Sequence, residues 1–142
     1  MRFLRKVSII TSYFKSENLY TFYIFHSQGG FDHERTFKLG SSGVIANQMA
    51  QALQKMGKPL YAVGNRTYEK AVAFAKKYGV QKVYSEIDEM FTDENVDIIY
   101  ITSPHNTHYA FMKKALLHGK HLFVEKSITL NSRELDEMIA LA

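Results

Sequence analysis

The sequence predicts an α/β fold, a doubly wound parallel sheet with the strand order 3-2-1-4-5. Short runs of β-branched and aliphatic residues alternate with helix-like stretches from about residue 34 to the end of the chain. This alternation implies right-handed crossovers, and hence a parallel sheet with helices on both faces. Glycines after the helix-like stretches and polar residues after the strand-like runs mark where the elements end.

The strands are expected to be short and mostly buried. We expect them at residues 36–40, 60–63, 82–84, 97–102 and 121–124. The fourth run is nearly all apolar, as is typical of a parallel strand covered on both faces.

The first two expected helices carry apolar residues at helical spacing. In the helix that begins near Val44, these residues are Ile45, Met49, Leu53 and Met56. In the next helix, which Thr67 is expected to cap, they are Ala71, Phe74, Ala75 and Tyr78. Gly57 and Gly79 stand where glycine caps belong at the two carboxyl ends.

Three further helices complete the expected series. Ser85 is expected to cap a brief third helix, and a fourth is expected at residues 107–118, ended by Gly119. Asn131 and Glu134 predict a capping box at the start of the last helix.

Composition limits the classes of protein that need to be considered. The chain has 142 residues, no cysteine and a net charge of +4, with acidic and basic residues mixed along the helices. We therefore expect a cytoplasmic protein without disulfides, bound neither to nucleic acid nor to a membrane. Residues 1–33 lack the regular alternation and are expected to be an N-terminal extension, whereas residues 34–142 form the domain.

The loop after the first strand resembles a dinucleotide-binding fingerprint. Gly43 is placed for close approach of the pyrophosphate, and Ala46 is small enough for helix–strand packing. Ser41 stands where the fingerprint has its first glycine. The loop is thus either a nucleotide site facing a helix N-terminus or an ordinary strand-to-helix turn.

The second strand ends at Asn65 and Arg66, where no carboxylate is available for the 2′-hydroxyl of NAD. An arginine at this place can pair with the 2′-phosphate of NADP, which favours NADP over NAD as the cofactor. The alternative is a surface arginine at the start of a helix.

Polar residues also follow the fourth strand. Pro104 stiffens the turn, and Asn106 and His108 offer hydrogen-bond donors where a nicotinamide ring would lie. The alternatives are that Asn106 or Thr107 caps the helix and that His108 is polar surface.

The fifth strand runs directly into Glu125 and Lys126. Lys126 can hydrogen-bond a substrate hydroxyl or the cofactor, with Glu125 holding it in place. A structural ion pair between the two side chains is the alternative.

Taken together, these spaced motifs resemble the Gfo/Idh/MocA oxidoreductases over residues 36–142. The motifs are Gly43-Val44-Ile45-Ala46, Asn65-Arg66-Thr67-Tyr68-Glu69-Lys70-Ala71, Phe74-Ala75, Val96-Asp97, Ser103-Pro104 with His108, and Gly119-Lys120-His121 with Glu125-Lys126. Ser127 departs from the family pattern, which has proline after the lysine.

The resemblance implies an NAD(P)-dependent dehydrogenase of sugars, polyols or diols. It implies that Lys126 lies beside nicotinamide and substrate as the catalytic residue, with no metal. The expected cofactor-binding residues are Ser41, Ser42, Gly43, Val44, Ile45, Asn65, Arg66, Ser103, Pro104, Asn106, His108, Glu125 and Lys126.

The family also has a second α/β domain that carries most of the substrate pocket. We expect the chain to be truncated before this domain, and therefore to bind a carbohydrate-like substrate only together with it and to be inactive alone. The alternatives are a non-catalytic nucleotide-binding or interaction module and a nonfunctional remnant.

Overall fold

Parallel strands form a single sheet in the computed structural model, which describes residues 36–40, 43–58 and 60–142. The strands are β1 (Thr36–Gly40), β2 (Ala62–Gly64), β3 (Lys82–Tyr84), β4 (Ile98–Thr102) and β5 (His121–Val124). Their order is β3-β2-β1-β4-β5, and all neighbours are parallel. The predicted fold class and strand order are therefore confirmed.

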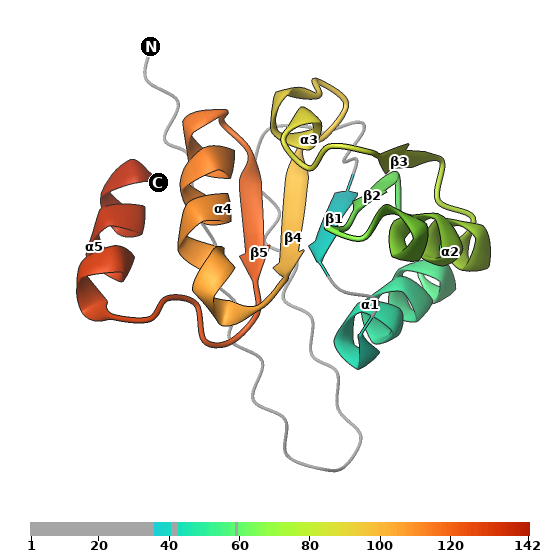
Figure 1. The fold of residues 1–142 in the computed structure, drawn as a ribbon, viewed down its shortest axis with the longest axis horizontal. Coiled ribbons are helices and arrows are strands. Elements are labelled where there is room, and N and C mark those ends of the chain that lie inside the picture. Colours follow the sequence, from blue (N-terminus) through green and yellow to red (C-terminus); the bar gives the residue numbers. More distant parts are fainter. Residues whose placement is uncertain (1–35, 41–42, 59) are drawn as a thin grey trace.

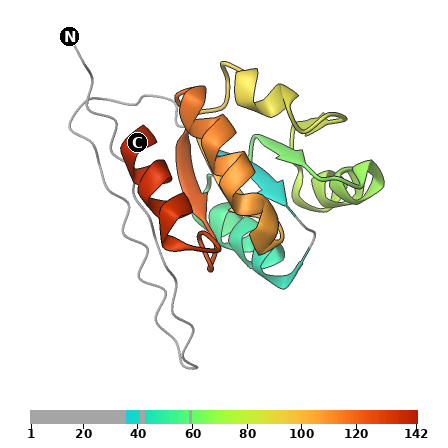
Figure 2. The same cartoon turned by 60° about the vertical axis from the view of Figure 1, so that its left-hand side comes forward.

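Helices cover both faces of this sheet (Figures 1 and 2). They are α1 (Val44–Lys55), α2 (Tyr68–Tyr78), α3 (Glu89–Thr92), α4 (His105–Leu117) and α5 (Ser132–Leu141). α1 and α2 pack on one face, whereas α3 and α4 cover the other, with α5 lying against α4. This is the doubly wound arrangement, in which the helices that connect the parallel strands lie on both faces of the sheet.

The core consists of two apolar clusters, one on each face of the sheet. β2 contributes to both, since Ala62 faces the α3–α4 side and Val63 faces the α1–α2 side, and both are almost fully buried. β4 supplies Ile99 and Ile101 to the α3–α4 side with no exposed surface. Burial on both faces explains why the fourth run is so uniformly apolar.

The buried face of α1 differs from the expected stripe. Ala46 and Ala50 are the buried residues, each 1% exposed, whereas Met56 is 45% exposed and Met49 is half-buried. Small side chains let this helix approach the sheet closely, so the larger apolar residues lie at the margin of the contact. The prediction for α2 is confirmed, because Ala71, Phe74, Ala75 and Tyr78 are all buried.

The predicted helix start was right in position at α2 and wrong at α3 and α4. Thr67 holds the N-cap position of α2, but the capping hydrogen bond is absent; instead Asn65 Oδ1 accepts from the Thr67 amide at 2.9 Å. α3 begins at Glu89 after Asp88, so Ser85 does not cap it. α4 begins at His105 after Pro104, and neither Asn106 nor Thr107 is its cap.

The carboxyl ends of the helices and the start of α5 follow the predictions. The glycines expected to end helices have positive φ angles: Gly57 (68°), Gly79 (67°) and Gly119 (73°). At α5, Asn131 Oδ1 accepts from the Glu134 amide at 3.0 Å, and the Glu134 carboxylate accepts from the Leu130 amide at 3.1 Å. The capping box thus forms, shifted by one residue on its carboxylate side.

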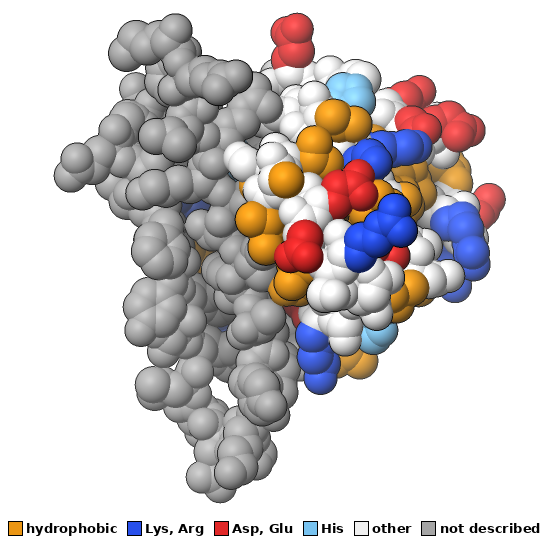
Figure 3. Space-filling model, turned by 90° about the vertical axis from the view of Figure 1, so that its left-hand side faces the viewer, with side chains coloured by type: hydrophobic (Ala, Val, Ile, Leu, Met, Phe, Trp, Pro, Cys, Tyr) orange, Lys and Arg blue, Asp and Glu red, His pale blue; other side chains and the backbone are white. Residues whose placement is uncertain are grey.

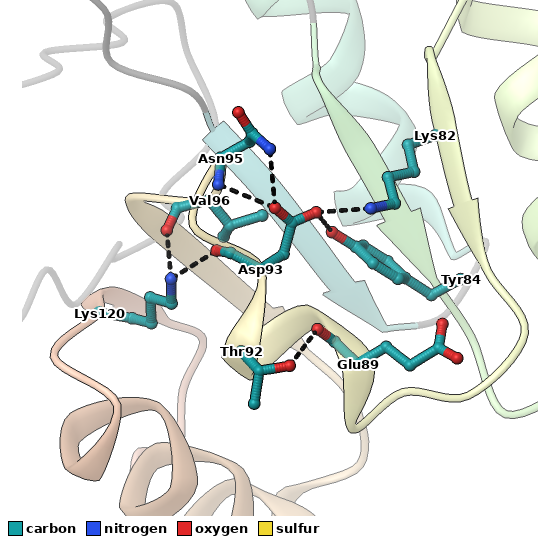
Figure 4. Close-up of polar contacts among 8 residues, drawn as sticks. All are labelled: Lys82, Tyr84, Glu89, Thr92, Asp93, Asn95, Val96 and Lys120. Atoms are coloured by element: carbon teal, nitrogen blue, oxygen red, sulfur yellow. Dashed lines mark hydrogen bonds and ion pairs between the residues drawn. The ribbon is translucent and has the colours of Figure 1, made fainter.

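The amino edge of the sheet is held by a polar cluster around Asp93 (Figure 4). Its carboxylate pairs with Lys82 Nζ at 2.7 Å. It also accepts hydrogen bonds from the Tyr84 hydroxyl and, at 2.8 Å, from the backbone amide of Asn95. Burial alone would raise the pKa of Asp93, but these hydrogen bonds together hold it well below its usual range. The same environment, chiefly burial, raises the pKa of Tyr84.

Lys120 extends this cluster towards β5. Its Nζ donates to the carbonyl oxygens of Asp93 at 2.6 Å and Val96 at 2.8 Å (Figure 4). Partial burial lowers the pKa of the Lys120 ammonium. An ion pair and hydrogen bonds therefore connect the loop before β4 both to β3 and to the segment before β5.

The surface on the α5 side mixes charges of both signs. Figure 3 shows acidic and basic side chains interspersed with apolar ones over the coloured part of this face. Among the described helices, none has the length and apolar character needed to cross a membrane. The expected extension at residues 1–33 lies outside the described residues.

Candidate functional site

The carboxyl ends of the strands line up along one edge of the sheet. Leu39 is in register with Gly64 on one side and with Ile101 on the other, and these partners are in register with Tyr84 and Val124 respectively. The five following loops therefore form a row, with the β1–α1 loop in the middle. At about 4.8 Å per strand, the loops after β2 and β5 lie roughly 14 Å apart.

The middle of the row is the start of α1. Gly43 is its N-cap in an extended conformation, and the first turn of the helix holds no acidic residue and no side-chain cap. Val44 is 72% exposed, Ile45 is half-buried, and Ala46 is buried as its fingerprint position requires. Ser41 and Ser42 lie outside the described residues. The described part of this loop thus presents bare backbone amides at a helix N-terminus.

Arg66 lines a cleft of about 240 Å³ between the loops after β2 and β3. The residues that line it are Asn65, Arg66, Ser85, Glu86, Ile87 and Asp88. Asn65 is half-buried and shapes the turn through its bond to the Thr67 amide. Arg66 is exposed and makes no ion pair within the described part of the chain.

The β4–α4 loop is ordered by its own hydrogen bonds. The Thr107 hydroxyl contacts the Ser103 hydroxyl at 2.7 Å and the Pro104 carbonyl at 2.6 Å. Pro104 is the N-cap of α4, and Asn106 in the first turn is exposed. Asn106 therefore presents its amide to solvent beside the row of loops.

His108 is buried, so the alternative that it is a polar surface residue was wrong. The ring has no exposed surface, and its nitrogens contact two carbonyl oxygens, Ser103 O from Nε2 at 2.8 Å and Ser127 O from Nδ1 at 2.9 Å. A neutral ring donates to one of these carbonyls, and an imidazolium donates to both. The imidazole thus links the loop after β4 to the loop after β5. Any direct contact between His108 and a cofactor stays a prediction.

Glu125 and Lys126 form no ion pair with one another, so the alternative interpretation of this motif was wrong. The Glu125 carboxylate accepts a hydrogen bond from the Tyr100 hydroxyl of β4, whereas Lys126 is exposed and has no ion pair within the described residues. Burial, reinforced by this hydrogen bond, raises the pKa of Tyr100, so the hydroxyl keeps its proton and donates it. The peptide bond that joins Lys126 to Ser127 is cis. Among the described residues, therefore, no ion pair with Glu125 holds the Lys126 ammonium in place.

Two groups of residues at this edge were missed by the sequence interpretation. Tyr100 was treated only as part of an apolar strand, although a buried tyrosine hydroxyl needs a hydrogen-bond partner. The segment from Glu86 to Asp88 was treated as part of a helix start, although it closely follows a strand end and holds two acids. No cluster of three or more metal-ligating side chains occurs in the described part of the chain.

Comparison with known proteins gives a family model for most of the chain. The model described as an oxidoreductase family with an NAD-binding Rossmann fold matches residues 39–142. Among solved structures, an NAD-binding oxidoreductase from Klebsiella pneumoniae is similar with a TM-score of 0.71 and 30% sequence identity, over 77% of this chain and 31% of that chain.

Curated relatives match the same part of the chain. The trans-1,2-dihydrobenzene-1,2-diol dehydrogenase of Oryctolagus cuniculus is 33% identical over 105 residues, which is 72% of this chain and 32% of the relative. The scyllo-inositol 2-dehydrogenase (NADP(+)) IolU of Bacillus subtilis is 36% identical over 83 residues, 58% of this chain and 25% of the relative. The chain thus spans about a third or less of the length of these relatives.

Proposed function

The chain belongs to the Gfo/Idh/MocA family of oxidoreductases with an NAD-binding Rossmann fold, and we propose that it binds NADP in preference to NAD as part of a dehydrogenase. The substrate class that we propose is a sugar, polyol or diol. The names of the relatives, which are dehydrogenases of a diol and of an inositol, support this class. The observation that carries the cofactor assignment is the exposed Arg66 in the cleft beyond β2.

The residues at the carboxyl edge fit a dinucleotide. Gly43 has no side chain to keep a phosphate away from the start of α1, and no acidic group in that turn repels one. Arg66 carries a planar pair of donors that suits the 2′-phosphate of the adenosine ribose. Asn65 and Ser85 add polar groups on the walls of the same cleft.

At the other end of the row, Lys126 and Asn106 are the exposed donors that would face the nicotinamide and the substrate. The bound nicotinamide supplies the hydride acceptor for oxidation of a hydroxyl-bearing carbon. Lys126, as the proposed catalytic residue, would donate a hydrogen bond to the oxygen of that hydroxyl and so help to orient the substrate. His108 and Tyr100 keep the two flanking loops in place beneath it.

The test is a titration of the purified 142-residue chain with NADPH and NADH, followed by nicotinamide fluorescence. The chain has no tryptophan, so the protein background is low. Arg66→Ala is expected to weaken NADPH binding about tenfold, since a hydrogen-bonded charge pair is lost. Arg133→Ala, an exposed arginine on α5, is the matched control and should leave both affinities unchanged.

Two results would overturn parts of this proposal. Failure to bind either cofactor would favour a non-catalytic interaction module or a remnant over a cofactor-binding domain. Tighter binding of NADH than of NADPH, unaffected by Arg66→Ala, would remove the preference for NADP.

We also propose that the 142-residue chain alone turns over little substrate, because it corresponds to about a third of the diol dehydrogenase relative. Substrate-dependent NADPH formation by this chain at ordinary enzyme rates would contradict that part.

A further inference from the structure

The cleft that holds Arg66 also holds acidic side chains from the facing loop. Glu86 and Asp88 both line it, together with the hydroxyl of Ser85. One basic residue and two acidic residues therefore line the same cleft of about 240 Å³. A ligand phosphate in this cleft meets both signs of charge.

The two carboxylates differ in how far their charge is already compensated. Asp88 is paired with Lys114 of α4, with Nζ to Oδ1 at 2.6 Å. Glu86 is exposed and takes part in no ion pair among the described residues. Glu86 is thus the acid whose negative charge is available to act on a ligand in the cleft.

We propose that Glu86 is a specificity-determining residue that limits the preference of this site for NADP over NAD. This inference rests on the proposed function, in which the cleft receives the adenosine ribose. A carboxylate accepts a hydrogen bond from a ribose 2′-hydroxyl, which NAD offers. The same carboxylate repels a 2′-phosphate, which carries about −1.5 to −2 charge at neutral pH.

Arg66 and Glu86 therefore have opposite effects on the preference between NADP and NAD. Arg66 attracts the 2′-phosphate, and Glu86 reduces that attraction while stabilising the unphosphorylated ribose. The two residues come from different loops, those after β2 and β3, so each can be changed without altering the element that holds the other.

The experiment compares dissociation constants for NADPH and NADH in the wild-type chain, in Glu86→Gln and in Glu94→Gln. Glu94 is an exposed acid in the segment before β4, at the opposite edge of the sheet, so its variant changes the net charge equally. Glu86→Gln is expected to shift the affinity ratio towards NADPH about two- to fivefold, the range for exposed charge interactions. Glu94→Gln should leave the ratio unchanged.

The shift should shrink as salt is added, because screening weakens interactions between exposed charges. A urea unfolding midpoint equal to that of the wild type checks that Glu86→Gln folds normally.

The outcomes separate this inference from the proposal on which it rests. If the wild type binds both cofactors and Glu86→Gln leaves their ratio unchanged, the role of Glu86 is overturned and the cofactor site stands. An equal loss of affinity for both cofactors would also overturn it, since that result would indicate that Glu86 only supports the structure of its loop. If the wild type binds neither cofactor, the proposed function fails and this inference fails with it.

Discussion

The two edges of the sheet use charged side chains in opposite ways. At the amino edge, Asp93 pairs with Lys82, and Lys120 donates to the backbone carbonyls of Asp93 and Val96 (Figure 4). At the carboxyl edge, Arg66 and Lys126 are exposed and have no ion pair in the described residues. Polar groups at the first edge stabilise the fold, whereas those at the second are available to a ligand.

His108 is the main exception to this division. It lies at the carboxyl edge, yet it is wholly buried and both ring nitrogens contact loop carbonyls. A binding edge made of separate loops needs at least one buried group that fixes those loops relative to one another. We therefore expect His108 to support both the stability of the fold and the proposed cofactor site.

Replacing His108 should produce the largest effect. His108→Ala is expected to lower the free energy of unfolding by about 3 kcal/mol, because it leaves a cavity and deprives at least one loop carbonyl of its buried hydrogen-bond donor. It should also weaken NADPH binding several-fold, since the loops after β4 and β5 lose their link. Urea unfolding and the nicotinamide titration measure the two effects, with the exposed neighbour His105→Ala as control. A loss below about 1 kcal/mol would contradict the bridging role.

At the amino edge, a change should affect stability alone. Asp93→Ala removes the partners of Lys82 and of the buried Tyr84 hydroxyl, and is expected to cost about 2 kcal/mol in urea unfolding. Cofactor affinity should be unchanged, because this cluster lies at the edge of the sheet opposite the proposed cofactor site. Glu94→Ala, which removes the adjacent exposed acid, should cost much less. An equal loss of NADPH affinity in Asp93→Ala would break the separation between the two edges.

The lowered pKa of Asp93 predicts how this stabilisation depends on pH. In the unfolded chain an aspartate takes up its proton near pH 4, whereas in the folded state Asp93 does so only at lower pH. The unfolded state therefore binds more protons in this range, and the contribution of Asp93 is lost progressively as pH falls below about 4. Unfolding free energies of wild type and Asp93→Ala, measured from pH 6 downwards, should converge by about 1 kcal/mol over that range. A difference in unfolding free energy between wild type and Asp93→Ala that stays constant with pH would show that Asp93 acts only through packing.

Regular features of the sequence predicted the fold well. The strand order followed from alternation, and the helix ends followed from Gly57, Gly79 and Gly119, whose positive φ angles suit glycine. Such signals are local: each depends on a few neighbouring residues. The buried face of α1 was harder to predict, because the choice of Ala46 and Ala50 over Met49 depends on how closely the helix approaches the sheet.

The polar contacts of the candidate site were harder still. Nothing near Glu125 in the sequence indicates that its partner is Tyr100, on the neighbouring strand. His108 was predicted from its position after a strand, but its burial depends on the Ser127 loop, which lies far along the chain. Loop positions at a sheet edge can be predicted from order and register, whereas pairings between those loops require the three-dimensional structure.

Lys126 gives the smallest expected effect on stability and tests the comparison most directly. Its ammonium is exposed and has no ion pair among the described residues, so Lys126→Ala should change the free energy of unfolding by less than about 0.5 kcal/mol. Lys82→Ala, which removes a lysine that is paired at the amino edge, is the matched comparison and should cost more in the same urea titration. If Lys126→Ala were the more destabilising of the two, Lys126 would be part of the structural framework, and its availability to a substrate would have no basis.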